Sequence, residues 1–253
     1  KMPVWTPGSY LVREFARHVQ DFSVKNASGA DLPWRKISKN TWQIDAKGAQ
    51  EIVATYKVYS NELTVRTNEL NDEHAFWNNT ALLLFPKGQL GASSTVKVIP
   101  YGNWRVATGL PQVAGQTNVF RAENFDILYD SPFEVSDFKE ITFDVRGKKH
   151  RIVVTGEGNY DLKRIATDVA KIIDACIEMF GEVDYDDYTI IMNLRGGGGL
   201  RGGTDRRLPA RGAVHRRCPR GPRGGGRSWS SALRRARAPR SQREYARPSP
   251  VRP

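Results

Sequence analysis

The 253-residue chain has a formal net charge of +12. The charge is uneven, because residues 1–200 hold 23 Lys and Arg against 25 Asp and Glu, while residues 201–253 hold 16 Arg, no Lys and 2 acidic residues. A basic nucleic-acid-binding body is therefore excluded for residues 1–200. The two cysteines, Cys176 and Cys218, form no Cys-x-x-Cys pair, so neither a disulfide framework nor a thiolate zinc site is indicated.

Short runs of β-branched and aromatic residues between positions 19 and 158 predict an antiparallel β domain. Two strands are expected on either side of the turn at 26–31. The stretch 51–60 alternates along the chain, which predicts a half-buried strand with one apolar face in the core. Further strands are expected at 95–99, 140–145 and 151–155. The sequence thus predicts a mainly β N-terminal domain, an antiparallel sheet or sandwich, over residues 1–155.

A helical period replaces the strand period after residue 156. Apolar residues recur at three- and four-residue steps from Leu162 to Phe180, with Asn159 or Asp161 as the N-cap and Gly181 as the stop. This pattern predicts an amphipathic helix of about twenty residues. Cys176 lies on its apolar side and is expected to be a small core residue and not a nucleophile.

The segment "DDYTIIMNL", at 186–194, predicts a strand with apolar residues on both faces. Such a strand suits either a covered position or an edge that lies along a cleft. A helix followed by a strand indicates a second domain of α/β type, which begins near residue 156.

No metal site or catalytic residue is expected in this chain. The four histidines lie far apart and include no His-Glu-x-x-His motif. Asp72, Glu73 and His74 are consecutive and point in different directions, so a polar loop beside buried Phe76 and Trp77 is favoured over a ligand cluster.

Four glycines, at 196–199, follow the predicted strand as a phosphate-binding loop would. No Gly-Lys-Ser/Thr ending and no helical pattern follow them, so nucleotide binding is not expected. Backbone without Cβ atoms has another use, because it lets a peptide or another chain approach closely.

Residues 201–253 carry a net charge of +14 and 7 of the 14 prolines, without apolar periodicity, and are expected to be disordered. One interpretation is an RNA-binding arm, since Arg-Gly-Gly occurs at Arg195 and Arg201. Another is an out-of-frame tail, because residues 1–200 use 13 Lys and 10 Arg whereas the tail uses Arg alone. The second interpretation predicts a frameshift near Leu200. Either way the tail should bind polyanions non-specifically.

No stretch approaches the about 18 apolar residues that a membrane-spanning helix needs, and the N-terminal residues lack the pattern of a signal peptide. We therefore expect no membrane partner, and a cytoplasmic location.

Five blocks of sequence occur in order within residues 1–200. They are "PVWTPGSYLVREFARHVQDF" at 3–22, "KNTWQI" at 39–44, "GNWRVATGLP" at 102–111, "DSPFEV" at 130–135 and "GGGL" at 197–200. As a set they closely resemble the glycyl aminopeptidase family, family sixty-one of the metallopeptidases. Members of this family are zinc enzymes of the gluzincin type and often carry a PDZ domain.

The resemblance implies a β-rich N-terminal domain followed by a thermolysin-like α/β catalytic domain, of which residues 156–200 are the truncated start. It implies that the strand at 189–194 receives a peptide by edge pairing. Gly197, Gly198 and Gly199 would then be vestigial substrate-binding positions.

The sequence departs from the family at Arg201 and Gly202, which stand where the family has Glu-His. Both zinc histidines, the general-base glutamate and the third ligand are missing, so no zinc cofactor and no peptide hydrolysis are expected in this chain. The full-length parent would use zinc to remove N-terminal residues from peptides. The alternatives are a non-enzymatic RNA-binding protein that acts through the tail, and a purely structural or partner-binding β domain.

Overall fold

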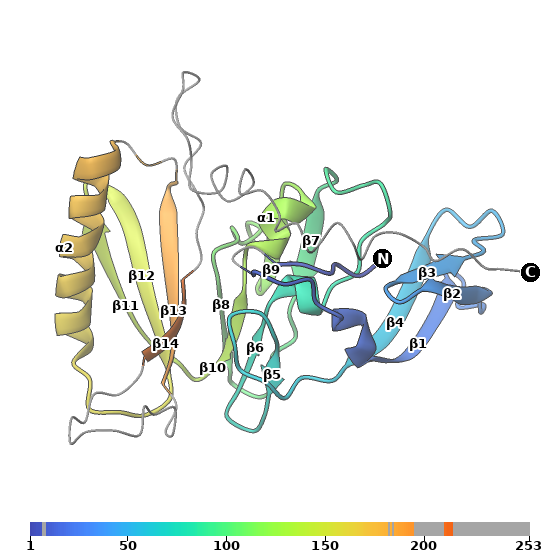
Figure 1. Ribbon diagram of the computed structural model, residues 1–253, viewed down its shortest axis with the longest axis horizontal. Coiled ribbons are helices and arrows are strands. Elements are labelled where there is room, and N and C mark those ends of the chain that lie inside the picture. The colour runs from blue at the N-terminus through green and yellow to red at the C-terminus, as the bar shows by residue number, and fades with distance from the viewer. Residues whose placement is uncertain (7–8, 182, 184, 195–209, 215–253) are drawn as a thin grey trace, which may run out of the picture.

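The computed structural model describes residues 1–6, 9–181, 183, 185–194 and, as backbone, 210–214. The predicted substrate-binding positions Gly197, Gly198 and Gly199 lie outside the described residues, as does the predicted disordered tail apart from 210–214. Figure 1 shows the sheets following one another along the long axis of the molecule, with the one long helix at one end.

The described part of residues 1–137 forms four antiparallel sheets, which confirms the predicted mainly β N-terminal fold. Three of the sheets are two-stranded, and the fourth lies beside the α/β end of the chain (Figure 1). The pairs are β1 (Val19–Asn26) with β4 (Ile52–Val58), β2 (Trp34–Ser38) with β3 (Thr41–Ile44), and β7 (Ser94–Lys97) with β9 (Val119–Ala122); the four-stranded sheet has the order β5 (Glu69–Leu70), β6 (His74–Trp77), β10 (Phe133–Ser136), β8 (Arg105–Thr108).

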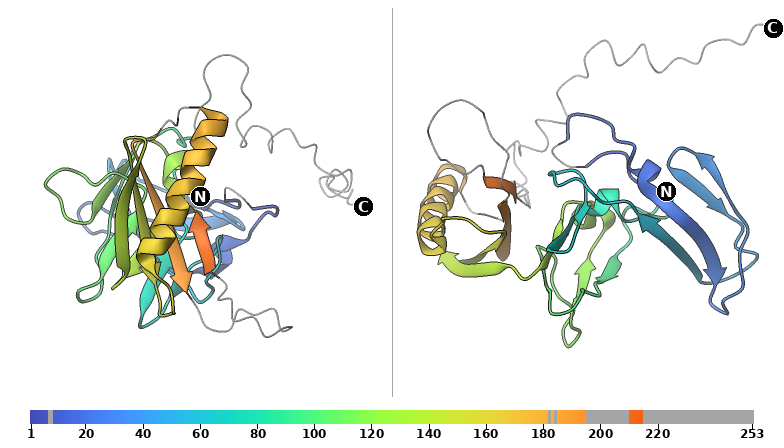
Figure 2. Two further views of the ribbon diagram at one scale, coloured as in Figure 1. Left: turned by 90° about the vertical axis from the view of Figure 1, so that its left-hand side faces the viewer. Right: turned by 90° about the horizontal axis from the view of Figure 1, so that it is seen from below.

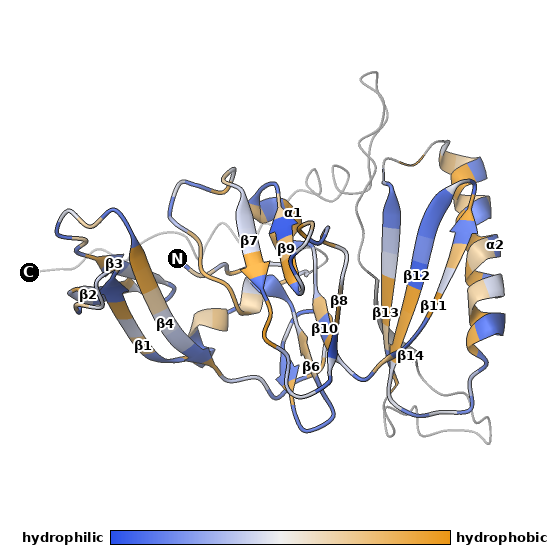
Figure 3. Cartoon of the chain, turned by 180° about the vertical axis from the view of Figure 1, so that it is seen from behind, coloured by the Kyte–Doolittle hydropathy of each residue, from blue (hydrophilic) through white to orange (hydrophobic). Residues whose placement is uncertain are grey.

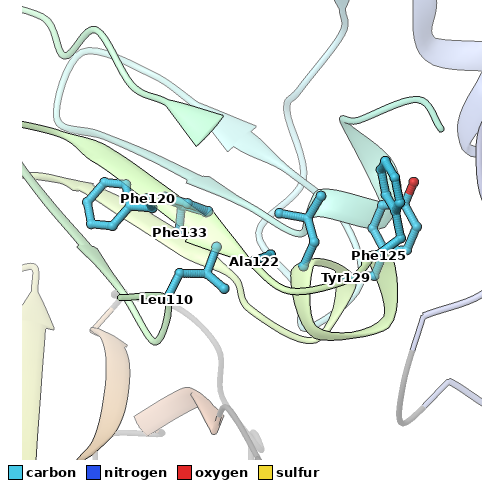
Figure 4. Packing of buried hydrophobic residues seen from close by; sticks show 7 residues of the cluster. Leu110, Phe120, Ala122, Phe125, Tyr129 and Phe133 are labelled. Atoms are coloured by element: carbon cyan, nitrogen blue, oxygen red, sulfur yellow. The ribbon is translucent and has the colours of Figure 1, made fainter. Parts of the chain in front are cut away.

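The core of this region forms where β9, β10 and the short helix α1 (Phe125–Tyr129) meet, as Figure 4 shows. The ring of Phe133 stacks on Trp77 with 5.0 Å between ring centroids and meets Phe120 edge-on at 5.5 Å. Asn124 is the N-cap of α1, and its side chain accepts a hydrogen bond from the backbone N–H of Ile127. Two 3-10 helices also occur: η1 (Phe15–His18) directly before β1, and η2 (Asn79–Ala81) between β6 and β7.

The half-buried strand predicted at 51–60 forms as β4, but neither of its faces is covered along its first half. Ile52 and Val53 lie on opposite faces and are 42% and 47% exposed. The reason is that, among the described residues, β4 makes extensive contact only with its partner strand β1, and no second layer packs on this half of the ribbon. Figure 3 shows the apolar stretch of β4 on this ribbon. The alternation therefore predicted correctly which side chains of β4 share a face. The predicted burial of one of these faces is not observed along the first half of the strand.

The second part of the molecule is one four-stranded sheet with the order β11 (Lys139–Val145), β12 (Lys148–Thr155), β13 (Asp187–Leu194), β14 (Ala210–Val214). Strands β12 and β13 are parallel, and helix α2 (Leu162–Phe180) connects them. This βαβ unit is the predicted α/β element. Figure 2 shows α2 lying across one face of the sheet. The sheet combines strands from both sides of residue 155, and the domain boundary placed there stays a prediction.

Helix α2 has the bounds and the caps that the sequence indicates. The side chain of Asp161 accepts hydrogen bonds from the backbone N–H groups of Lys163 and Arg164, at 2.9 and 3.2 Å. Gly181, with φ +84°, ends the helix. The prediction that Cys176 is a core residue was wrong, because its side chain is exposed. Neither described helix, α1 or α2, is long and apolar enough to cross a membrane.

Candidate substrate-binding edge

The carboxyl ends of the parallel strands β12 and β13 lie side by side, since Thr155 pairs with Asn193 in the register. Ligand sites in sheets with parallel strands lie at this end. From here the chain continues toward the predicted substrate-binding glycines. The candidate site is therefore built from the ends of β12 and β13 and from the residues that hold them.

Strand β13 is paired on both sides. On one side it follows β12, and on the other β14 runs antiparallel to it, from Ile190 opposite Val214 to Leu194 opposite Ala210. The sequence left open a covered position or an edge along a cleft, and in the structure β13 is covered. Because a segment of the same chain forms this ladder, the backbone of β13 is shaped to accept an extended antiparallel strand.

Gly156 determines how closely the chain passes the end of β13. Its φ is +96°, and a Cβ atom placed on it would lie 2.1 Å from the carbonyl oxygen of Leu194. No L-residue with a side chain fits there without moving one of the two segments. This role cannot be predicted from the sequence, because a single glycine after a strand carries no signal of a contact 38 positions later.

A buried charged cluster lies in the four-stranded sheet next to the site. Nδ1 of His74 is 3.1 Å from Oε1 of Glu134, and Nε2 of His74 is 3.2 Å from Oε2 of Glu69. His74 is 1% exposed and Glu134 is fully buried. Since both ring nitrogens face carboxylate oxygens, both are placed to donate, as an imidazolium does. Asp72 and Glu73 lie in the predicted exposed polar loop, but His74 is not part of it, because it is the first residue of β6 and is buried.

Two sets of hydrogen bonds join this sheet to β12. Oγ1 of Thr155 donates to Oε1 of Glu134 at 2.9 Å and lies 3.0 Å from Oγ of Ser136. At the other end, the guanidinium of Arg151 donates to the carbonyl oxygen of Thr108 at 3.1 Å. The end of β12 is thereby held against a buried carboxylate of the N-terminal part.

Asn193 adds a polar atom to the same end of the sheet. It is 3% exposed, and its Oδ1 has no hydrogen-bond partner within the described part of the chain. Most buried side-chain oxygens in folded proteins have a partner. The end of β13 therefore carries a buried acceptor close to where the glycine segment begins.

The described residues do not fit a zinc ion. They contain no group of three or more His, Cys, Asp or Glu side chains that could hold a metal. His74 faces two carboxylates, and His150 contacts the carbonyl oxygen of Lys148 at 2.9 Å and the hydroxyl of Tyr185 at 3.0 Å. Burial lowers the pKa of His150, so it is a neutral core residue at neutral pH.

The chain is similar to a known protein family and to solved structures. The family model described as the Peptidase M61 N-terminal domain matches residues 1–137. The crystal structure of an aminopeptidase N family protein from Idiomarina loihiensis has a TM-score of 0.68 and 36% sequence identity, covering 74% of this chain and 33% of that one. The chain thus spans about one third of that relative. No curated protein matches the sequence.

Two further structures are similar at lower identity. An M1 zinc metallopeptidase from Deinococcus radiodurans has a TM-score of 0.44 and 11% identity, covering 72% of this chain and 47% of that one. A two-domain M1 zinc metallopeptidase bound to L-arginine has a TM-score of 0.39 and 12% identity, covering 68% and 47%.

Proposed function

This chain belongs to the peptidase M61 family, and from that premise we propose that it is the N-terminal part of a zinc aminopeptidase and hydrolyses no peptides by itself. The observation that carries the proposal is the family match over residues 1–137, which the 36% identical relative extends to 74% of the chain. A catalytic zinc needs three protein ligands, and the described residues offer no such set.

In the full-length parent, β13 would hold the substrate as an extended strand. In this chain β14 occupies that edge of β13, and in the parent a substrate peptide would take the place of β14 and make the same kind of backbone ladder. Gly197, Gly198 and Gly199 lie three to five positions after the end of β13 and would let the peptide approach without Cβ atoms in the way. The parent would release N-terminal residues with a zinc-activated water, and glycyl substrates are the first class to try.

An assay of the whole chain tests the proposed lack of activity. Glycyl and alanyl p-nitroanilides are incubated with the chain, with and without added zinc chloride, and the release of nitroaniline is followed. We expect no release above the buffer blank. Turnover that a chelator abolishes and added zinc restores would overturn the proposal.

The reading-frame hypothesis is tested on the coding DNA across Gly196 to Gly203 and beyond, read in all three frames. We expect another frame to continue into Glu-His and then His-Glu-x-x-His. If no frame does so, the arginine-rich residues 201–253 are a genuine part of the protein, and binding through them becomes the leading function.

The alternative function, RNA binding, is favoured by one observation, the +14 charge of residues 201–253. Charge alone predicts similar affinity for RNA and heparin, with a steep loss as salt rises. Fluorescence anisotropy with several RNAs of equal length separates the two functions. A preference of at least about tenfold for one RNA sequence would support the alternative, since non-specific charge pairing carries no sequence information.

A further inference from the structure

A groove of about 520 Å³ lies between helix α2 and strand β11. Its apolar lining comes from Ile141 and Phe143 of β11 and from Ala166 and Ala170 of α2. The two alanines keep the helix side of the groove free of large side chains. Ile141 and Phe143 are only partly buried. The groove thus offers apolar surface that the described part of the chain leaves open.

The groove follows an open edge of the sheet. Within the described residues β11 pairs only with β12, and α2 packs mainly against β11 (Figure 1). The register of β11 on β12 runs without a bulge, and β11 contains no proline. Bulges and prolines are common devices that block the edge of a sheet. The outer N–H and C=O groups of β11 can therefore pair with an added strand.

Strand β11 and helix α2 run side by side in the same direction. At the start of β11, Lys139 lies over the ring of Tyr160, just before α2. At its end, Arg146 forms an ion pair with Asp174 in the second half of α2. A strand added to β11 would therefore lie along the groove and along the helix.

The helix side of the groove is basic. Lys163, Thr167 and Lys171 line it at four-residue steps and are exposed. Lys163 has no ion pair within the described part of the chain, while Lys171 lies 3.4 Å from Asp168. Asp168 also lies 3.9 Å from Arg164, so one carboxylate serves two basic residues. This wall therefore keeps a surplus of positive charge.

The spacing of the two lysines defines what fits. Lys163 and Lys171 are eight residues apart, which is about 12 Å along a helix. In an extended peptide, two side chains four residues apart share a face and are separated by about 13 Å. Two acidic side chains at this spacing can each reach one lysine. Asp144, the acidic residue that lines the groove, lies on the strand side and favours carboxylates on the helix side.

We propose that the groove between α2 and β11 binds an extended acidic segment of another protein, which adds to β11 as a further strand. Two acidic side chains four residues apart pair with Lys163 and Lys171, and an apolar side chain midway between them enters the groove. This edge of the sheet is opposite to the one that β14 occupies, so the inference is independent of the proposed substrate edge.

Fluorescence anisotropy of a labelled peptide, Thr-Ser-Glu-Thr-Val-Thr-Glu-Ser-Thr, titrated with the full chain at about 0.15 M salt, measures the binding. We expect saturable binding with a Kd below about 1 mM. The matched control peptide exchanges the second glutamate with the threonine before it, which keeps the charge but turns one carboxylate to the other face. It should bind at least about fivefold more weakly. A peptide N-methylated throughout its centre cannot form the ladder and should not bind.

Variants of the chain locate the site. Lys163→Glu should weaken binding of the first peptide at least about fivefold, because one carboxylate then meets a like charge. Arg164→Glu is the matched control: it makes the same charge change at the next residue, which does not line the groove, and should leave the affinity close to unchanged. On binding, hydrogen–deuterium exchange should slow in β11 and stay the same in β13. Circular dichroism confirms that each variant is folded.

Four results would overturn the proposal. They are no saturable binding, equal affinity for the two charge-matched peptides, equal effects of Lys163→Glu and Arg164→Glu, and slowed exchange in β13 in place of β11. Equal affinity for the two peptides would point to non-specific binding by the +14 charge of residues 201–253.

Discussion

At the scale of single residues, Gly156 has the strictest backbone requirement in the candidate site. Its φ of +96° and the close carbonyl oxygen of Leu194 allow no side chain. Gly147 offers a comparison, because its φ is +78° but nothing lies within 4 Å of a Cβ atom placed there. Substitutions at these two glycines therefore separate the free-energy cost of a left-handed backbone from the free-energy cost of a steric clash.

Gly156→Ala should therefore lower the free energy of unfolding by at least about 3 kcal/mol, and Gly147→Ala by about 1–2 kcal/mol, the cost of the left-handed conformation alone. Urea denaturation followed by tryptophan fluorescence gives both values. Equal losses in the two variants would mean that the chain moves away from Leu194 at little cost.

Asp130, at the end of α1, should make stability depend on pH. Burial raises the pKa of its carboxyl group from 3.8 to about 7. In the unfolded chain this group loses its proton near pH 4, whereas in the folded protein it keeps the proton to about pH 7. The folded state therefore binds more protons in this window, and the contribution of Asp130 to stability falls as the pH rises from 4 to 7.

Asp130→Asn should remove this dependence. The variant should match the parent below about pH 4 and become more stable by up to a few kcal/mol above about pH 7, where the parent holds a half-buried charge. Thermal unfolding across this pH range measures the difference. A constant difference between the two proteins at all pH values would contradict the assignment.

At the scale of elements, local sequence determined α2 best. Its apolar period, the aspartate before it and the glycine after it are all contained in one stretch, and the helix spans Leu162–Phe180 as the pattern indicates. The sequence left Asn159 and Asp161 open as the N-cap, and the structure selects Asp161.

Asp161→Ala should cost about 1 kcal/mol, because two backbone N–H groups lose their acceptor. Asn159→Ala, two residues earlier and outside the helix, is the control and should be close to neutral. Thermal unfolding by circular dichroism at 222 nm, a wavelength that reports helix, compares the two. A larger loss for Asn159→Ala would move the N-cap to that residue.

Whether an apolar face is buried was harder to predict than which residues share that face. The alternation in β4 and the apolar side of α2 were both read correctly, yet Ile52, Val53 and Cys176 are exposed. A periodic pattern states which residues share a face, and only the partners of an element decide whether that face is buried. In both elements the apolar face is wider than the surface packed against it.

At the scale of the whole molecule, the two parts of the chain meet through a few specific contacts. Val153 of β12 packs in one buried cluster with Ala107 and Phe138, and Thr155 donates to Glu134. None of these contacts was visible in the sequence. Glu134 and His74 are 60 positions apart, and only the pairing of β6 with β10 brings them together.

Glu134→Gln should lower the free energy of unfolding by about 3–5 kcal/mol, because it leaves His74 with one carboxylate fewer in a buried site. Glu140→Gln is the control: Glu140 forms an ion pair with Arg105 at 2.7 Å that is about one-third exposed on the carboxylate side, and its loss should cost under about 1 kcal/mol. Equal losses in the free energy of unfolding, measured by urea denaturation, would show that the buried cluster contributes no more to stability than a surface ion pair.

Because β12 pairs with β13, and α2 lies between them in the chain, β12 must wait for this partner strand during synthesis. A ribosome makes β11 and β12 first, and then the whole of α2, before β13 emerges. During that interval Ile152, Val153 and Val154 of β12, all buried in the finished sheet, have β11 as their only neighbouring strand. The nascent chain thus displays an apolar strand edge for as long as residues 156–194 take to be translated. A chaperone that binds extended apolar segments would bind the nascent chain at β12. Slower translation of residues 156–194 would lengthen the time available for this binding.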